Sequence, residues 1–373
     1  MKCHNITLTK IEYKKEDLFV NSEDPELPYR RRKDEEKTSV SWGQRKLLLV
    51  LLQFLNLFWD KNKVEKPVVI YAGAAPGINI KIVSELYPEV EFHLYDPAPF
   101  KIKSTSKIHL YNEYFTDKTA RKWADRNDIY FISDIRTADY TLVSNLDKNE
   151  AQILSDMKNQ MNWHQIIKPV EAQLKFRLPY TGGNRPETVE YLTGWVFKQP
   201  WAPQTTTETR LVPTSDPSDL TKKWNCMKYQ SQMFHHNTIV RETYKYKNFI
   251  NSDLTHLDEP ELLNDWDSMT EAWILRDYLI RRGSNPSYVP TLSKLLTKKL
   301  TKKSKFNDNL DTLRNTPQLI KNRNFRPSRD TINPTFRPIK PKITPDKPPK
   351  LNMLERNERI ELNESTLAKE LGL

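Results

Sequence analysis

The chain has 373 residues and a mass of 44.1 kDa, with 37% hydrophobic residues, 8 glycines and a mean hydropathy of −0.74. This length suits one large domain or two ordinary ones, and the low hydropathy indicates that part of the chain stays outside a core. The formal net charge of +11 favours a polyanionic partner, nucleic acid before an anionic membrane surface.

Cysteine usage and apolar runs narrow the class of protein further. The two cysteines, Cys3 and Cys226, exclude a disulfide framework and favour a reducing compartment. The N-terminus lacks the apolar core of a signal peptide. The longest apolar run, residues 47–59, is interrupted by Gln53 and Asn56 and is too short to span a bilayer. We therefore expect a soluble intracellular protein with no membrane partner.

The predicted elements alternate between strands and helices for most of the chain. Residues 1–40 are polar and predict an arm with few core residues, and residues 44–61 predict a helix that is buried nearly all round. Strands are predicted at 67–73, 91–96, 107–112 and 129–135, with helices at 78–88 and 144–167 and a polar helix before 129. Strand-like runs at 171–179, 190–199 and 205–213 precede helical patterns at 218–244 and 259–283. The order predicts an α/β fold with a mostly parallel sheet, flanked by helices and ending in antiparallel strands.

A change of composition separates a domain at 41–285 from a tail at 286–373. Residues 294–350 are rich in Lys, Arg, Asn and Pro and repeat the triplet Phe-Arg-Pro at 325–327 and 336–338. Such a segment buries too little to offset its ordering entropy, so we expect it to be largely disordered. Its interleaved charge and rings fit loose binding of single-stranded RNA, and a linker to a partner-binding terminal helix fits equally well.

The stretch VVIYAGAAPG, residues 68–77, places two of the scarce glycines directly after a buried strand. A glycine turn between a strand and a helix lets a ligand approach the backbone. Asp96 ends the next strand about 20 residues later, where nucleoside-binding folds place a carboxylate that binds the ribose hydroxyls. The stretch is neither G-x-G-x-x-G nor a P-loop. An ordinary strand-to-helix turn explains it equally well at this point.

Four charged residues interrupt otherwise apolar segments: Lys46, Asp134, Lys175 and Glu208. A buried lysine is costly unless it is paired, so each of them alone indicates a structural salt bridge or an edge-facing side chain. Together, two lysines and two carboxylates can form one compensated cluster that turns a lysine into a proton acceptor. No metal-ligand spacing is visible along the chain.

Five motifs, in order and at similar spacing, resemble one viral family. They are SWGQRKLLLVLLQFL, VVIYAGAAPG, FISDIRT, LKFRLPY and QPWAPQTTTETRL. The chain is similar over about residues 25–280 to the poxvirus cap-specific mRNA 2′-O-methyltransferases, which double as the stimulatory small subunit of the viral poly(A) polymerase. The resemblance implies a Rossmann-like fold that uses S-adenosylmethionine (SAM), in the cytoplasm or a virion.

The resemblance also implies roles for individual residues. Lys46, Asp134, Lys175 and Glu208 fall on the family's catalytic tetrad, with Lys175 as the general base for a ribose 2′-hydroxyl. The implied cofactor contacts are Gln44, Tyr71, Gly73, Ala75, Pro76, Gly77, Asp96 and Asp134. Arg136, Arg177 and Arg210 would hold the RNA backbone. A poly(A) polymerase catalytic subunit is the implied protein partner; a non-catalytic RNA-binding subunit, or a methyltransferase for uncapped RNA, remains an alternative.

The implied cap site is where the sequence departs from the family. Two aromatic rings sandwich the cationic 7-methylguanine in these relatives, and Tyr29 and Tyr180 match those ring positions. The family's two acidic positions, which fix the edge of the base, are occupied by Gly182 and Gln230. The mode of cap recognition is therefore open.

Overall fold

We analysed a computed structural model that describes residues 12–30, 42–138, 146–214, 218–246, 265–302, 366–369 and 371. Its main sheet has seven strands in the order β3-β2-β1-β4-β5-β8-β7. The strands are β1 (Val68–Ala72), β2 (Glu91–Tyr95), β3 (Ile108–Tyr111), β4 (Ile129–Ser133), β5 (Glu171–Phe176), β7 (Gly194–Phe197) and β8 (Thr209–Pro213). β6 (Thr188–Leu192) and β9 (Thr221–Asn225) form a separate two-stranded ribbon.

The direction of the strands identifies the fold class. β3, β2, β1, β4 and β5 are parallel, whereas β8 is antiparallel to both β5 and β7. The order reverses between β1 and β4, which is the topological switch point of a Rossmann-like sheet. The predicted fold, mostly parallel with antiparallel strands at the end, is confirmed.

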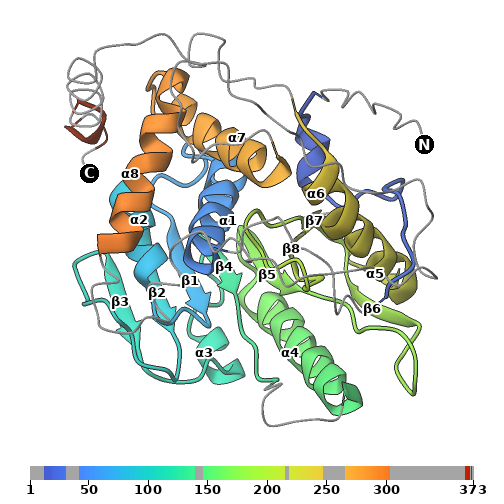
Figure 1. Cartoon of the computed structure of the whole chain (residues 1–373). Coiled ribbons are helices and arrows are strands. Elements are labelled where there is room, and N and C mark those ends of the chain that lie inside the picture. The colour runs from blue at the N-terminus through green and yellow to red at the C-terminus, as the bar shows by residue number, and fades with distance from the viewer. Residues whose placement is uncertain are drawn as a thin grey trace, which may run out of the picture.

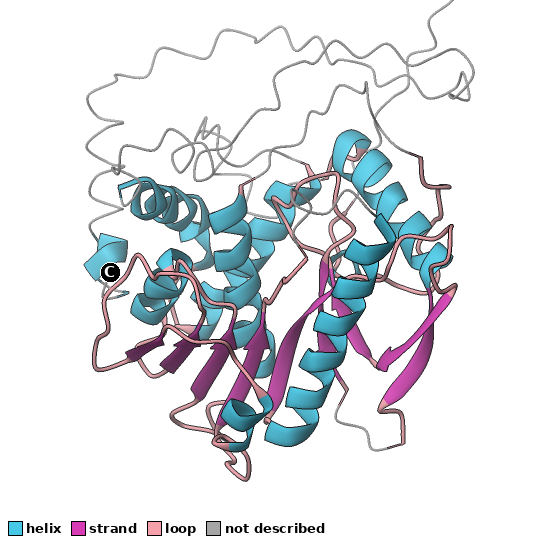
Figure 2. Cartoon of the chain, turned by 90° about the horizontal axis from the view of Figure 1, so that it is seen from below, coloured by secondary structure: helices cyan, strands magenta, loops and turns pink. Residues whose placement is uncertain are grey.

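Helices cover both faces of this sheet (Figures 1 and 2). One face carries α1 (Gly43–Phe58), α2 (Ile78–Leu86), α7 (Trp266–Arg281) and α8 (Val289–Lys302). The other face carries α3 (Asp117–Arg121) and α4 (Leu146–Ile167). The remaining helical segments are η1 (Lys15–Leu18), α5 (Cys226–His235), η2 (His236–Val240), α6 (Arg241–Thr243) and η4 (Pro286–Tyr288).

Alternating residues of each strand build the two cores. In β1, Val69 and Tyr71 join the core beneath α1 and α2, whereas Val68, Ile70 and Ala72 join the core on the side of α4. This is the period-two alternation of a strand that is buried on both faces, and it explains the continuous apolar run in the sequence.

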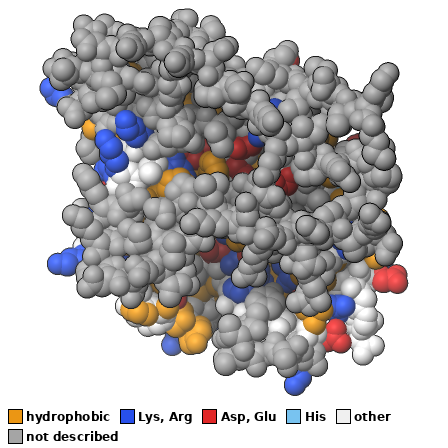
Figure 3. All heavy atoms as spheres, in the orientation of Figure 1, with side chains coloured by type: hydrophobic (Ala, Val, Ile, Leu, Met, Phe, Trp, Pro, Cys, Tyr) orange, Lys and Arg blue, Asp and Glu red, His pale blue; other side chains and the backbone are white. Residues whose placement is uncertain are grey.

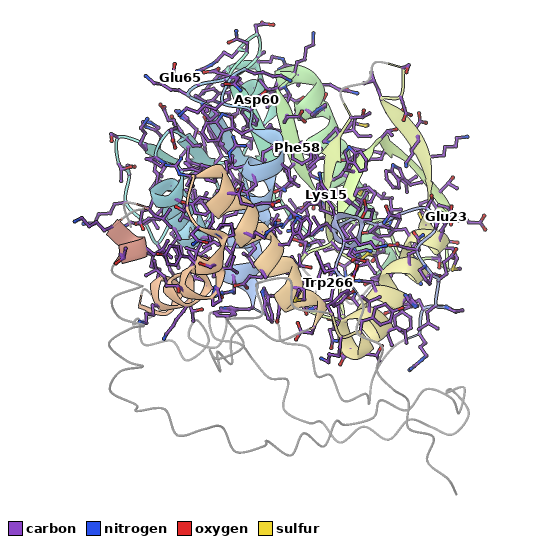
Figure 4. The ribbon with its side chains drawn as sticks, turned by 90° about the horizontal axis from the view of Figure 1, so that it is seen from above. Lys15, Glu23, Phe58, Asp60, Glu65 and Trp266 are labelled. Atoms are coloured by element: carbon purple, nitrogen blue, oxygen red, sulfur yellow. The ribbon has the colours of Figure 1, made fainter. Side chains whose placement is uncertain are left out.

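The N-terminal segment contributes more to the core than its composition predicts. Tyr13, Leu18 and Phe19 are buried in the same cluster as α1 and α7. The indole of Trp266 donates a hydrogen bond to the Asp17 carbonyl at 3.2 Å; Trp266 and Lys15, the first residue of η1, are labelled in Figure 4. A few apolar residues, spaced within a polar stretch, therefore anchor residues 13–19 to the domain.

Two further elements differ from the sequence prediction. The pattern at 218–244 predicts one helix, but its start forms β9, whose polar residues pair with β6 in the exposed ribbon. The tail predicted from residue 286 begins with η4 and α8, and α8 packs on α7, α2 and α1. The Phe-Arg-Pro repeats lie outside the described residues. The predicted terminal helix is described at 366–369 and 371, with Leu367 in the core of the α1 face.

Across the described parts of the chain, we find no helix with the length and apolar character needed to cross a membrane.

Candidate active site at the carboxyl edge of the sheet

The predicted site residues gather at one edge of the sheet. Gly73, Asp96 and Asp134 directly follow β1, β2 and β4, so they lie at the shared carboxyl end of the parallel strands. Glu208 directly precedes β8, and because β8 is antiparallel, its first residue, Thr209, pairs with Phe176 at the end of β5. Ligands of open α/β sheets bind outside this edge at the switch point, which here lies between β1 and β4.

The two glycines after β1 are favoured by their left-handed backbone conformation, and Gly73 also by its close approach to another backbone segment. Gly73 has φ +82°, and a Cβ placed on it would lie 2.8 Å from the carbonyl carbon of Asp134. Gly77 has φ +81°, and its Cβ would lie 2.8 Å from the Ile102 side chain. The family resemblance implies that these glycines lie against a cofactor, and the structure adds an internal conformational reason for both.

Asp96 ties the glycine loop to the end of β2. Its carboxylate accepts hydrogen bonds from the amides of Ala75 at 2.9 Å and Ala98 at 2.8 Å, one on each oxygen. Each carboxylate oxygen has a second lone pair. Asp96 therefore holds the loop in place, and its carboxylate can still accept further hydrogen bonds from hydroxyl groups.

The other predicted cofactor residues lie on β1, on α1 and in the loop itself. Tyr71 is buried in β1, where burial, reinforced by the charge of Asp134, raises the pKa of its phenol well above the usual value. The loop itself contains a cis peptide bond between Ala75 and Pro76. The side-chain oxygen of Gln44, in the first turn of α1, is buried, and no described residue forms a hydrogen bond with it. A buried acceptor of this kind suits a polar ligand, and together with the Asp96 carboxylate it fits the hydroxyl and amino groups of a nucleoside-type cofactor.

The four charged residues singled out from the sequence meet in one cluster. The Lys175 Nζ lies 2.9 Å from the Asp134 Oδ1 and 3.6 Å from the Glu208 Oε2. The Lys46 Nζ lies 3.1 Å from the other Glu208 oxygen, Oε1. All four side chains keep 11–15% of their surface exposed, so the cluster is nearly buried yet open to a substrate.

Arg210 is a fifth member that the sequence interpretation assigned to RNA. Its guanidinium lies 2.7 Å from Asp134 and 3.7 Å from Glu208, and its side chain is only 3% exposed. It pairs across the sheet with Lys175, and the carboxylates between them offset the repulsion of two facing cations. This position does not suit contact with an RNA phosphate. Alternation along the strand, which puts residues 208 and 210 on one face, is the signal that was missed.

The cations determine the protonation of both carboxylates. Burial alone would raise the pKa of Glu208, but Lys175, Lys46 and Arg210 outweigh it and hold that pKa well below the usual value. Burial likewise opposes ionisation of Asp134, and Arg210 and Lys175 together lower its pKa. Both groups are therefore carboxylates at neutral pH, and both face the Lys175 Nζ.

The loop after β4 adds another cation at the rim. Arg136 lies 3.6 Å from Glu208 and 4.0 Å from Asp156, and 18% of its side chain is exposed. Asp156 anchors the loop by accepting hydrogen bonds from both the amide and the hydroxyl of Thr137. Arg136 is thus the arginine of the predicted RNA set that remains at the mouth of the cluster.

The two tyrosines predicted to sandwich a base stack on each other instead. The Tyr29 and Tyr180 ring centroids are 5.3 Å apart and the rings are inclined by 27°. A base inserted between them needs a separation of about 7 Å, two van der Waals contacts, so the rings have to part by about 2 Å. The structure therefore places the two predicted rings next to each other, but without the gap that a base between them would need.

Arg177, which was predicted to contact RNA, packs its guanidinium against the ring of Tyr180. Its guanidinium lies 4.3 Å from the Tyr180 ring centre and 2.6 Å from the Glu150 carboxylate, and it is buried. Gln230, at one of the family's acidic positions, accepts a hydrogen bond from the Thr181 amide at 2.9 Å. Gly182 follows with φ +101°. These residues hold the loop that carries Tyr180, and Arg177 is too enclosed for a phosphate.

Comparison with known proteins identifies the family. Residues 12–273 match the family model described as the poly A polymerase regulatory subunit. The chain belongs to this family. It is 27% identical over 254 residues to a fowlpox virus (strain NVSL) protein named cap-specific mRNA (nucleoside-2′-O-)-methyltransferase, covering 64% of this chain and 80% of the relative. A myxoma virus (strain Lausanne) protein of the same name is 23% identical over 239 residues, covering 60% and 69%.

Among solved structures, the chain is similar to bluetongue virus VP4, described as a multifunctional RNA-capping production line, at 14% identity and a TM-score of 0.36. The match covers 65% of this chain and 40% of that one, so the chain spans about two fifths of the length of that protein.

Proposed function

We propose that this protein is a SAM-dependent RNA ribose 2′-O-methyltransferase that acts on the cap-proximal nucleotide of mRNA. The observation that carries the proposal is the cluster itself, in which Lys175 faces Asp134 at 2.9 Å and Glu208 at 3.6 Å at the carboxyl edge of the sheet. Family membership and the names of the viral relatives support the same reaction.

The cofactor site of this proposal is formed by the loop after β1 and its neighbours. Asp96 would accept the ribose hydroxyls, and Gln44, with its free buried oxygen, would meet a polar group. Tyr71 and the 73–77 loop would form the remaining wall. SAM, when bound there, supplies an electrophilic methyl group.

Lys175 would move the proton in this reaction. A ribose 2′-hydroxyl is a weak nucleophile, so a neutral Lys175 Nζ would accept its proton as the oxygen forms its new bond. Asp134 and Glu208 would stabilise the resulting ammonium, and they are already positioned to do so. Lys46 and Arg210 would hold the two carboxylates in place, and with Arg136 they would leave the site positive enough for an RNA phosphate.

The test is methyl transfer from labelled SAM to capped RNA. Lys175→Ala should reduce transfer by a factor of roughly 100–10,000, the usual contribution of a general base. Lys175→Arg keeps the positive charge but cannot be deprotonated, so it should be equally impaired. Lys158→Ala, which removes an exposed lysine of α4, is the matched control and should behave as wild type. An active Lys175→Arg enzyme would exclude the general-base role.

The choice of RNA separates the proposal from methylation of another RNA. The proposed enzyme should methylate capped RNA in preference to the same RNA without a cap. Opening of the Tyr29–Tyr180 stack around 7-methylguanine would supply this preference, by contact of a cationic base with two rings. Equal rates on both substrates would favour an enzyme for uncapped RNA.

A second role, stimulation of a poly(A) polymerase, is favoured by the family model. It would be tested by adding the chain to a catalytic subunit from the same source and measuring extension of an RNA 3′ end. Lys175→Arg should stimulate as well as wild type, because this role needs binding surfaces and not the base. A chain that stimulates but never methylates would be a binding subunit.

A further inference from the structure

A compact group of potential metal ligands lies away from the active site, on β2 and β3. The parallel register places His93 of β2 directly opposite His109 of β3. Glu91, two residues before His93, points to the same face of the sheet. These three residues come from the two outermost parallel strands, seen beside each other in Figure 1. Only the strand register unites them, which is why spacing along the sequence did not indicate a metal site.

The three side chains converge on one point. Glu91 Oε1 lies 2.8 Å from the Nε2 of His93 and 3.1 Å from the Nε2 of His109. Within the described residues, this is the one group of at least three His, Cys, Asp or Glu side chains whose ligand atoms all lie within 4.8 Å of one another. The His109 Nε2 is shielded from solvent although 37% of its side chain is exposed.

We propose that Glu91, His93 and His109 form a binding site for a divalent transition-metal ion of the zinc class. Two imidazoles and one carboxylate are borderline ligands that suit Zn²⁺ and its neighbours, and not Mg²⁺ or Ca²⁺. Bonds of about 2.0–2.2 Å place neighbouring ligand atoms roughly 3.3 Å apart in a tetrahedral site. The atoms of Glu91 and the two histidines need to separate only slightly to reach that spacing.

The surroundings of His93 favour a metal-binding orientation. Its second ring nitrogen, Nδ1, lies 3.1 Å from the Tyr111 hydroxyl, and the Trp123 ring packs edge-on against the imidazole at 4.6 Å. An Nδ1–H that donates to Tyr111 leaves the Nε2 lone pair facing Glu91, as in metal sites whose histidines are oriented by a second hydrogen bond. The nearby cation Arg126 is held by Asp128 at 2.6 Å.

His109 supplies the adjustment that the site requires. The two imidazoles stack at 4.4 Å with planes 20° apart, so one of them has to turn before both lone pairs meet at a metal. His93 is 12% exposed and fixed by Tyr111 and Trp123, whereas the more exposed His109 has room to turn. The bound ion would keep a fourth position open to water and would join the edge strand β3 to β2.

Titration of the metal-free, tag-free full chain with ZnCl₂ in a calorimeter tests the proposal. One equivalent should bind to wild type, and bound zinc should raise the melting temperature by about 3 °C or more. Bound Co²⁺ should give the visible absorption of a four- or five-coordinate ion. Absence of stoichiometric binding would overturn the proposal.

Matched variants locate the site. His109→Ala and Glu91→Gln each remove one ligand and should weaken zinc binding by roughly 100-fold, and Tyr111→Phe, which removes only the orienting hydroxyl, by roughly 10-fold. His235→Ala removes an imidazole of α5 and should bind as wild type. Wild-type affinity in a His93→Ala/His109→Ala double variant would place the ion elsewhere and refute the assignment. The outcome is independent of methyl transfer, because no residue of the proposed active site is altered.

Discussion

Gly73 carries a conformational constraint that connects the loop after β1 to the loop after β4. Its φ of +82° is strained for any residue with a side chain, and a Cβ would contact the Asp134 backbone at 2.8–3.0 Å. We expect Gly73→Ala to lower the free energy of unfolding by about 1–3 kcal/mol or more. Because Asp134 has to move, methyl transfer should fall as well. Urea unfolding and the methyl-transfer assay measure the two effects.

Gly43 provides the control for this substitution. It begins α1, and a Cβ placed there would meet no atom of the described residues within 4 Å. Gly43→Ala should therefore change stability by less than about 0.5 kcal/mol. If the two variants behaved alike, the close approach of the two loops would not be what requires glycine at position 73.

At the residue scale, context in the sequence predicted the cluster but not all of its members. Lys46, Asp134, Lys175 and Glu208 stood out because each interrupts an apolar segment, and the structure brings them together. Arg210 did not stand out as a partner of Asp134, because a buried arginine and a phosphate-binding arginine look the same in a sequence. Only the pairing of β5 with β8 distinguishes them.

At the scale of elements, the first turn of α1 is held in place by a buried ion pair. The Arg45 guanidinium binds the Glu271 carboxylate of α7 and donates to the Thr297 hydroxyl of α8 at 2.6 Å. Both partners of the ion pair are at most 2% exposed. Since Gln44 and Lys46 flank Arg45, this contact of three helices determines where two predicted site residues lie.

Arg45→Met should therefore destabilise the protein by about 3–5 kcal/mol, because it leaves the Glu271 carboxylate buried without its cation. Adding Glu271→Gln should recover part of the loss, because it replaces the buried charge by a neutral amide. In the wild-type protein the Glu271 carboxylate accepts hydrogen bonds from Trp201 and Ser293, and both residues remain as hydrogen-bond partners for the amide. Chemical denaturation of the single and double variants measures both values. A double variant less stable than Arg45→Met would show that the ion pair is not the source of the effect.

The sequence predicted helices and strands correctly where their apolar residues form continuous runs. The strands β1, β2 and β4 and the helix α1 are apolar runs, and the sequence placed each of them to within a few residues. The helix α8 was missed because it begins a long segment rich in Lys, Arg, Asn and Pro, and its few apolar residues were read as part of that segment; four of them, Val289, Leu292, Leu296 and Leu300, are buried. β9 was missed because an exposed two-stranded ribbon needs few apolar residues.

At the scale of the whole molecule, the basic net charge does not describe the charge balance of the candidate site. Figure 3 shows both Lys and Arg and Asp and Glu side chains between the grey residues of one face, and the net charge of +11 belongs to the whole sequence. In the candidate active site, the cations Lys46, Lys175 and Arg210 are matched with carboxylates at distances of 2.7–3.7 Å. Composition could indicate the surface charge, but the internal pairing depends on the topology of the sheet.

His236 lies where distant segments of the molecule meet. It is buried in η2 with its ring edge-on to Trp266 of α7 at 4.4 Å, and Trp266 in turn binds the N-terminal segment through the Asp17 carbonyl. Burial, with the charges of Lys198 and Arg241, holds the pKa of His236 well below its usual value of 6.5. The imidazole is therefore neutral in the folded protein at neutral pH.

This lowered pKa predicts a loss of stability in acid. As the pH falls below about 6.5, His236 binds a proton in the unfolded chain but not in the folded protein. Its contribution to the free energy of unfolding therefore falls by up to about 1.4 kcal/mol per pH unit. His236→Gln cannot titrate, and groups common to both proteins cancel in the comparison. Urea unfolding at pH 7.5, 6 and 5 measures the unfolding free energy of wild type minus that of the variant. This difference should change little above pH 6.5 and should decrease at lower pH, because only wild type loses stability through this residue. A difference that stayed constant down to pH 5 would mean that His236 accepts its proton in the folded state, and that solvent reaches the junction between η2, α7 and the N-terminal segment.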